Sequence, residues 1–186
     1  MKYFELRSGN KMPAVGLGLW QIPKEICADI VYEAIKAGYS CFDGACNYGN
    51  EKEAGLGIRR AIDEGLVTRD DLFITTKLWN TYHRIEYVEM ACRKSMDDLG
   101  VEYLDLYLIH WPISLPFVPI EERYPPGWIN YDPQLNEGQP RMILDNGVTY
   151  RQTWQAMEGL VTKGLVRDIG CSNIDCLMIQ QVMCSA

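Results

Sequence analysis

Leu104-Asp105-Leu106-Tyr107-Leu108-Ile109-His110 is a short, largely apolar run that ends in an ionisable side chain. Its length and its bulky apolar residues are typical of a buried β-strand. Similar runs with polar ends are Cys41-Phe42-Asp43, Thr75-Thr76-Lys77 and Ile169-Gly170-Cys171, the last followed by Ser172-Asn173. Side chains at the carboxyl ends of parallel strands meet on one face when the sheet curls into a barrel. The polar strand ends therefore favour a barrel over an open sheet.

Strand patterns alternate with helix patterns along the chain. A short segment at the amino terminus is expected to pair as a β-hairpin. Five further strands are predicted, at Val15–Trp20, Tyr39–Asp43, Leu72–Lys77, Leu104–His110 and Val166–Cys171. Apolar residues at helical spacing follow each strand and predict helices over residues 25–37, from Asn50, over Arg84–Leu99, from Thr149 and from near Ile174. Asn50 with Glu53, and Thr149 with Gln152, predict capping boxes for two of these helices.

Five consecutive strand–helix units imply a parallel sheet covered by helices. A doubly wound sheet would close within this length, whereas an eight-stranded barrel usually needs about 250 residues. Because the strand ends favour the barrel, we predict an α/β fold of the (β/α)8 TIM-barrel type, with about five of its eight βα units present plus the N-terminal hairpin. Residues 1–186 are expected to form a single domain. Seven of the nine prolines lie between Pro112 and Pro140, which predicts a long loop over about residues 112–148.

Composition narrows the classes of partner. Acidic residues outnumber basic ones 25 to 18, and the net charge of -7 argues against nucleic acid as a partner. The seven cysteines lack the paired spacing of zinc or redox sites, so we expect reduced thiols and no metal. No apolar run is long enough to suggest a signal peptide or a membrane partner. We expect a soluble, cytoplasmic protein.

Four segments resemble the signature segments of the aldo-keto reductase family. They are Phe42-Asp43-Gly44-Ala45-Cys46-Asn47-Tyr48-Gly49-Asn50-Glu51, Thr76-Lys77-Leu78-Trp79-Asn80, Leu108-Ile109-His110-Trp111-Pro112 and Ile169-Gly170-Cys171-Ser172-Asn173. The resemblance spans the whole chain. Residues 117–127 are similar to the xylose reductase branch in particular, whereas His110-Trp111-Pro112 is closer to the aldose reductases.

The resemblance implies a catalytic tetrad at Asp43, Tyr48, Lys77 and His110. The chemistry of these residue types supports it, because an ammonium beside a phenol makes that phenol a stronger acid. Asp43 would hold Lys77 as a charge partner, and Tyr48 would protonate the alkoxide that forms when hydride adds to a carbonyl. Neutral His110 would orient and polarise that carbonyl.

The resemblance also implies a nicotinamide cofactor, usually NADPH, with NADH as the second option. Ser172 and Asn173 match the family positions that hold the nicotinamide carboxamide, and Asp43 is expected near the cofactor as well. Trp20, Trp79 and Trp111 match an aromatic wall that, with His110, would bind a small carbonyl substrate. The alternative for each tryptophan is plain core packing. His83 is expected to be a solvated residue at a helix start.

Two other oxidoreductase motifs are incomplete in this sequence. Gly16-Leu17-Gly18 begins like a dinucleotide-binding fingerprint, but Gln21 occupies the position of the third glycine. Tyr48 and Lys52 have the Y-x-x-x-K spacing of short-chain dehydrogenases, yet no glycine-rich turn precedes them. Lys52 is expected to be a solvated helix residue.

Two hypotheses for function remain open. We expect the chain to be truncated at its C-terminus, because the last three units of the barrel, which bind most of the cofactor in the family, lie beyond residue 186. In the first hypothesis it is part of an NAD(P)H-dependent reductase of aldehydes and ketones, including aldose sugars such as xylose. The remaining residues of that reductase would then lie outside this sequence or come from another copy of the chain. In the second it is a catalytically inactive homologue that acts as a binding or regulatory module. For a lone fragment, exposed strand edges predict self-association.

Overall fold

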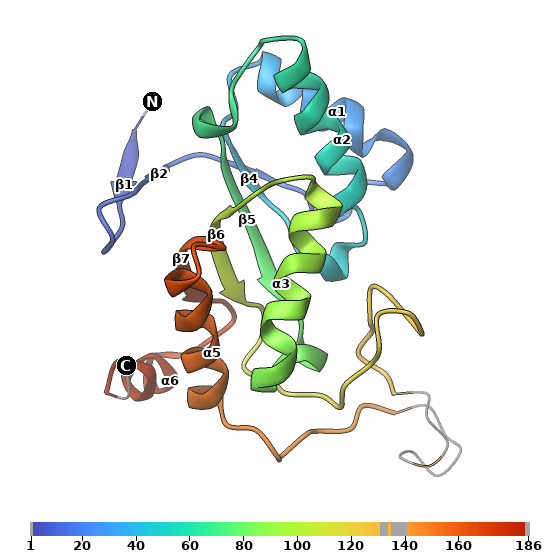
Figure 1. Ribbon diagram of the computed structural model, residues 1–186, viewed down its shortest axis with the longest axis vertical. Helices are drawn as coiled ribbons and strands as arrows, with labels where there is room; N and C mark the ends of the chain where they lie inside the picture. The colour runs from blue at the N-terminus through green and yellow to red at the C-terminus, as the bar shows by residue number, and fades with distance from the viewer. Residues whose placement is uncertain (1, 131–133, 135–140, 185–186) are drawn as a thin grey trace.

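The computed structural model describes residues 2–130, 134 and 141–184, and of residues 181 and 182 only the backbone. A two-stranded antiparallel hairpin, β1 (Tyr3–Glu5) and β2 (Lys11–Pro13), precedes the main sheet. The sheet is parallel and has five strands, β3 (Leu17–Gly18), β4 (Cys41–Asp43), β5 (Phe73–Leu78), β6 (Leu104–Ile109) and β7 (Val166–Cys171). The predicted hairpin and parallel sheet are confirmed (Figure 1).

The helices follow the strands in turn. They are α1 (Lys24–Lys36), α2 (Glu51–Asp63), α3 (Ile85–Leu99), α5 (Tyr150–Thr162) and α6 (Cys176–Met183), with three short 3-10 helices, η1 (Cys46–Tyr48), η2 (Arg69–Asp71) and η3 (Asn80–Tyr82). Among the described residues, none of the helices has the length and apolar character needed to cross a membrane.

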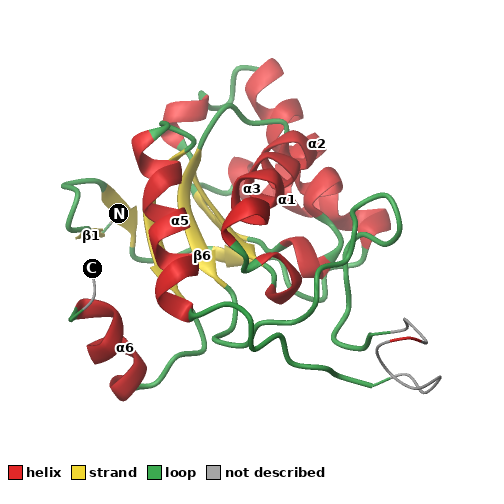
Figure 2. Ribbon diagram, turned by 60° about the horizontal axis from the view of Figure 1, so that its bottom comes forward, coloured by secondary structure: helices red, strands yellow, loops and turns green. Residues whose placement is uncertain are grey.

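The order of the strands distinguishes the barrel from the doubly wound sheet. The five strands lie side by side in the order of the chain, without the reversal that a doubly wound sheet requires. The helices keep the same order, since α1 packs on α2, α2 on α3 and α3 on α5, as a layer over the sheet (Figures 1 and 2). This is the arrangement of a partial (β/α)8 barrel, as predicted.

Two glycines in α2 allow this helix layer to form. A Cβ at Gly55 would lie 2.5 Å from the carbonyl oxygen of Leu99, and a Cβ at Gly57 would lie 2.4 Å from that of Ala28. No side chain fits at such distances, so only glycine lets α2 approach both neighbouring helices this closely. The position of α2 matters for the site because the helix begins three residues after Tyr48.

The apolar stripe predicted for α3 forms most of its buried face. Val88, Cys92, Met96 and Leu99 are buried in the main hydrophobic core. Ile85, which the pattern placed on the same stripe, is the first residue of the helix and is 52% exposed. Gly100 ends the helix in the left-handed conformation, as its position predicted.

The two predicted capping boxes differ in outcome. At α5 the capping box is confirmed, since Thr149 Oγ1 accepts from Gln152 N and Gln152 Oε1 accepts from Thr149 N. At α2 the prediction is wrong: Asn50 occupies the cap position but makes no side-chain cap bond. Its amide donates instead to the carbonyls of Leu19 and Ile22. Hydrogen bonds to these distant carbonyls thus replace the local cap bond.

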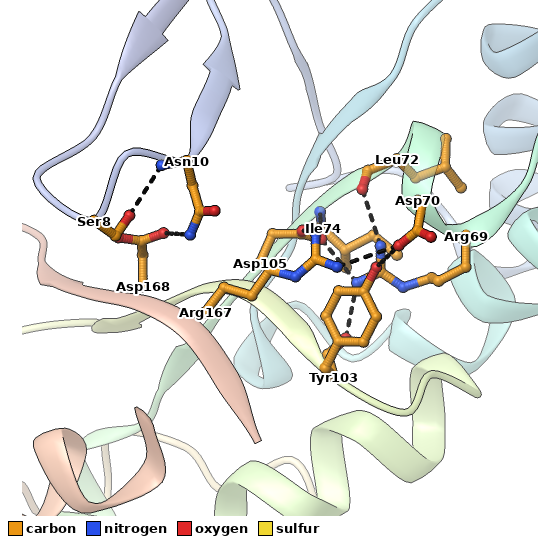
Figure 3. A network of polar contacts seen from close by, with 10 residues as sticks. All are labelled: Ser8, Asn10, Arg69, Asp70, Leu72, Ile74, Tyr103, Asp105, Arg167 and Asp168. Atoms are coloured by element: carbon orange, nitrogen blue, oxygen red, sulfur yellow. Dashed lines mark hydrogen bonds and ion pairs between the residues drawn. The ribbon is translucent and has the colours of Figure 1, made fainter. Parts of the chain in front are cut away.

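A charged network joins three strands at their amino ends (Figure 3). Asp105 on β6 is 3% exposed and accepts from Ile74 N at 2.9 Å, from Arg69 Nη2 at 2.7 Å and from Arg167 Nη1 at 3.3 Å. The two guanidinium carbons lie 3.9 and 4.0 Å from the centroid of the Tyr103 ring. This network holds β5, β6 and β7 together at the end opposite to the polar strand ends.

Replacing Asp105 should destabilise the fold. In Asp105→Asn the guanidinium groups of Arg69 and Arg167 lose their buried counter-charge, which we expect to lower the free energy of unfolding by about 2 kcal/mol. Equilibrium unfolding in urea measures this change. Asp70→Asn is the matched control, because the Asp70 side chain belongs to the same network but is 80% exposed, so little change is expected. Equal effects of the two substitutions would contradict the assignment of Asp105 as the centre of the network.

Candidate active site

The carboxyl ends of β4, β5 and β6 bring three of the predicted residues together. Asp43 is the last residue of β4, Lys77 is the penultimate residue of β5, and His110 directly follows β6. Tyr48 enters from η1, which follows β4 after two residues. Because the strands are parallel and in register, their ends lie at the same edge of the sheet.

Lys77 is the centre of this group. Its ammonium is almost fully buried and donates to Asp43 Oδ1 at 2.7 Å, to Gly44 O at 2.9 Å and to Tyr48 OH at 3.1 Å. An ammonium has three donor hydrogens, so these three acceptors account for all of them. Because the Tyr48 oxygen accepts from Lys77, its own hydrogen can be donated elsewhere. The arrangement therefore presents a phenolic proton beside a fixed positive charge.

His110 lies beside Tyr48 and is buried, with 6% of its surface exposed. The two rings meet edge to face with centroids 5.7 Å apart. Burial, together with the charge of Lys77, lowers the pKa of His110 to about 4. The imidazole is therefore neutral near pH 7, when one ring nitrogen can donate a hydrogen bond and the other can accept one.

Aromatic side chains surround His110. Trp79 is fully buried and packs edge to face on the His110 ring at 5.3 Å, and Trp111 stacks on it at 6.0 Å. Trp128 contacts both tryptophans, at 4.8 and 5.4 Å between ring centroids. Trp128 was not predicted from the sequence. Its position in the proline-rich loop was the one sequence feature that could have pointed to it. Trp20, in contrast, is 67% exposed.

Ser172 and Asn173 follow β7 at the same edge of the sheet. Ser172 N donates to Ile109 O at 2.9 Å, and Asn173 Nδ2 donates to His110 O and to Ser172 Oγ, both at 2.8 Å. The Asn173 backbone is left-handed, with φ of 56°. These bonds place both residues next to His110. Because Asn173 donates through its nitrogen, its side-chain oxygen remains an acceptor for an amide group.

The prediction for His83 is wrong, and the one for Lys52 is confirmed. His83 is 3% exposed rather than solvated, and burial lowers its pKa to about 4. It is buried because Thr153 of α5 packs against the same turn and donates to the His83 carbonyl at 2.8 Å. The side chain of Lys52 is 71% exposed, as expected for a solvated helix residue.

The fold and the strand-end site together define a barrel protein of the α/β class with a lysine–tyrosine pair at its mouth. The family model described as "Aldo/keto reductase family" matches residues 14–186, and the chain belongs to this family.

Curated relatives and solved structures agree with the family. "Probable NAD(P)H-dependent D-xylose reductase xyl1" of Emericella nidulans is 51% identical over 179 residues, which are 96% of this chain and 54% of that protein. "NADPH-dependent aldose reductase GRE3" of Saccharomyces cerevisiae is 49% identical over 178 residues, again 96% and 54% of the two chains. The chain thus spans about half the length of these relatives.

Among solved structures, the aldose reductase from Schistosoma japonicum matches with a TM-score of 0.86 and 37% identity, covering 100% of this chain and 57% of that one. The aldo-keto reductase of Bombyx mori in complex with NADP matches with a TM-score of 0.82 and 36% identity, covering 100% and 54%. At this identity the likeness supports both the fold and the family.

The effect of Lys77 on His110 can be measured directly. The chain has two histidines, and both should titrate near pH 4 in the folded protein rather than near the ordinary value of about 6.5. Burial alone lowers the pKa of His83, whereas the charge of Lys77 also lowers that of His110. In Lys77→Met the His110 ring should titrate at a higher pH than in the unmodified chain, with His83 unchanged. NMR titration of the ring resonances tests this, and a parallel shift of both histidines would count against it.

Proposed function

We propose that this chain is part of an NAD(P)H-dependent reductase that converts aldehydes and ketones to alcohols. The observation that carries the proposal is the ammonium of Lys77 between Asp43 and Tyr48, with neutral His110 alongside. The relatives named as D-xylose and aldose reductases support the same reaction and suggest aldose sugars such as xylose as substrates. NADPH is the expected cofactor, with NADH as the second option.

The residues beside His110 fit a nicotinamide. The side-chain oxygen of Asn173 and the hydroxyl of Ser172 would hold its carboxamide group, and Asp43 lies at the same edge of the sheet. When bound, the nicotinamide supplies a hydride to the carbonyl carbon. The structure of the Bombyx mori aldo-keto reductase in complex with NADP supports a nicotinamide cofactor of this kind.

Residues of the chain then protonate the substrate oxygen and stabilise the charge that remains. Hydride addition leaves the electron pair of the broken C=O π bond on oxygen, as an alkoxide. The Tyr48 hydroxyl gives its proton to that oxygen, which forms the alcohol and leaves a phenolate. Lys77 stabilises the phenolate by the hydrogen bond and charge it already provides, and Asp43 holds Lys77 in place.

Neutral His110 orients the substrate in this proposal. A neutral imidazole can donate to the carbonyl oxygen without competing with Tyr48 as the source of the proton. Trp79, Trp111 and Trp128 close off the space beside it and would exclude water from the reacting carbonyl. Trp20, although exposed, would complete the wall when substrate is bound.

The phenolic proton is tested by Tyr48→Phe. The variant should bind NADPH as the unmodified chain does, which a titration followed by the cofactor's fluorescence measures. It should reduce a simple aldehyde about 100-fold or more slowly, because the general acid is gone. Tyr3→Phe is the control, since Tyr3 lies on the exposed hairpin. Turnover that persists unchanged in Tyr48→Phe would refute the proton donor. Absence of NADPH binding by the unmodified chain would instead support a binding or regulatory module.

We also propose self-association of this chain through its sheet edges. Within the described residues, β3 and β7 are the outer strands of the sheet, each hydrogen-bonded to one neighbour. The outer edge of β7 therefore has backbone groups available to another strand. Light scattering after size exclusion should show a mass that rises with protein concentration. A monomer mass at every concentration would contradict the proposal.

A further inference from the structure

Two buried polar residues follow Tyr48 and take no part in the proposed chemistry. Asn50 is 1% exposed and Glu51 is 3% exposed. A buried carboxylate is costly unless hydrogen bonds replace its hydration. We therefore asked what these two residues, called here the Asn50–Glu51 pair, hold together.

Asn50 holds the loop between β3 and α1. Its side-chain nitrogen donates to Leu19 O at 2.9 Å and to Ile22 O at 3.0 Å, the carbonyls on either side of Trp20 and Gln21. An amide nitrogen has two hydrogens, so both are used. The loop that carries Trp20 is therefore attached to the start of α2.

Glu51 holds three other elements. Its Oε1 accepts from Thr76 Oγ1 at 2.6 Å, and its Oε2 accepts from Ser95 Oγ at 3.1 Å and from Tyr124 OH at 3.3 Å. Thr76 belongs to β5, Ser95 to α3, and Tyr124 to the loop after β6. All three partners are hydroxyl donors, which a carboxylate can accept at once.

The bond to Thr76 acts on the same strand as the bond between Lys77 and Tyr48. Successive side chains of a strand point to opposite faces, so Thr76 faces the helices while Lys77 faces the interior of the curled sheet. Glu51 is three residues from Tyr48, and Thr76 is next to Lys77. The carboxylate thus fastens the Tyr48 segment to β5 on one face, while the ammonium joins them on the other.

The bond to Tyr124 extends this connection to the aromatic wall. Tyr124 lies in the segment of residues 112–130, which also carries Trp128, and Trp128 contacts Trp79 and Trp111. The Lys94 ammonium lies over the Tyr124 ring, 4.5 Å from its centroid. Glu51 therefore contacts both the strand of the proton-donor pair and the segment of the substrate wall.

We propose that Glu51 is a positioning residue, which sets the approach of Tyr48 to Lys77 through Thr76 and ties the segment of residues 112–130 to that pair through Tyr124. This inference rests on the proposed reductase function for its kinetic consequences but not for its geometry. Asn50 contributes by fixing the Trp20 loop to the same short stretch of chain.

The hydrogen bond between Thr76 and Glu51 is tested by Thr76→Val, which removes the hydroxyl and keeps the shape of the side chain. We expect kcat to fall about tenfold with KM little changed, because a displaced phenol delivers its proton less well. Thr153→Val is the matched control: Thr153 is equally buried and donates a similar bond, to His83 O at 2.8 Å, away from the pair. The control should keep wild-type kcat and KM, whatever its loss of stability in urea.

The hydrogen bond between Glu51 and Tyr124 is tested separately by Tyr124→Phe, which keeps the aromatic ring. This variant also keeps the proposal testable if Thr76→Val does not fold. We expect KM for the aldehyde to rise about fivefold or more, with a smaller change in kcat, because the wall segment loses its anchor but the proton donor keeps its own. Glu51→Gln should combine both effects, since an amide has one acceptor oxygen in place of two.

A measurement without turnover separates this inference from the proposed function. Crystal structures of the unmodified chain and of Thr76→Val, with Glu51→Gln as the second variant, should show the distance from Lys77 Nζ to Tyr48 OH widening beyond the 3.1 Å found here. If the unmodified chain shows no turnover, this distance still tests the role of Glu51. An unchanged distance in both variants, or the same kinetic loss in Thr153→Val, would overturn the role of Glu51.

Discussion

The site depends on a lysine ammonium whose three hydrogens are all committed. An unpaired buried ammonium costs several kcal/mol, so Lys77 needs acceptors at this depth. Asp43 and Gly44 of the neighbouring strand segment provide two acceptors, and Tyr48 provides the third. The curl of the parallel sheet is what places these groups at one edge. The charge and the fold therefore support each other.

The two ends of the sheet have different roles. At the amino ends, Asp105 accepts from Arg69 and Arg167, and the network joins three strands. At the carboxyl ends, the His110 Nδ1 is buried without a hydrogen-bond partner among the described residues, and Tyr48 keeps a hydrogen to donate. A hydroxyl with a hydrogen to donate suits the end of the sheet where barrel proteins carry their sites, whereas the opposite end serves stability.

The parts of the structure that the sequence predicted are those governed by periodicity. The strands that end in Asp43, Lys77 and His110, the stripe of α3 and the cap at Thr149 all follow from local patterns, and they are correct within a few residues. Predictions from local sequence were wrong where long-range contacts determine the structure. The Asn50 side chain donates to carbonyls of a distant loop rather than forming the helix cap, and His83 is buried under α5. Trp128 and Glu51 escaped notice because their partners lie far along the sequence and share no spacing rule.

The tryptophan cluster has a consequence for spectroscopy. Trp79, Trp111 and Trp128 are three of the five tryptophans in the chain, and their rings are in edge contact next to His110. Aromatic rings held in fixed packing contribute to the near-ultraviolet circular dichroism of a folded protein, so this cluster should give a signal that is sensitive to its own packing. The protein therefore carries its own optical reporter at the mouth of the sheet, without any added label.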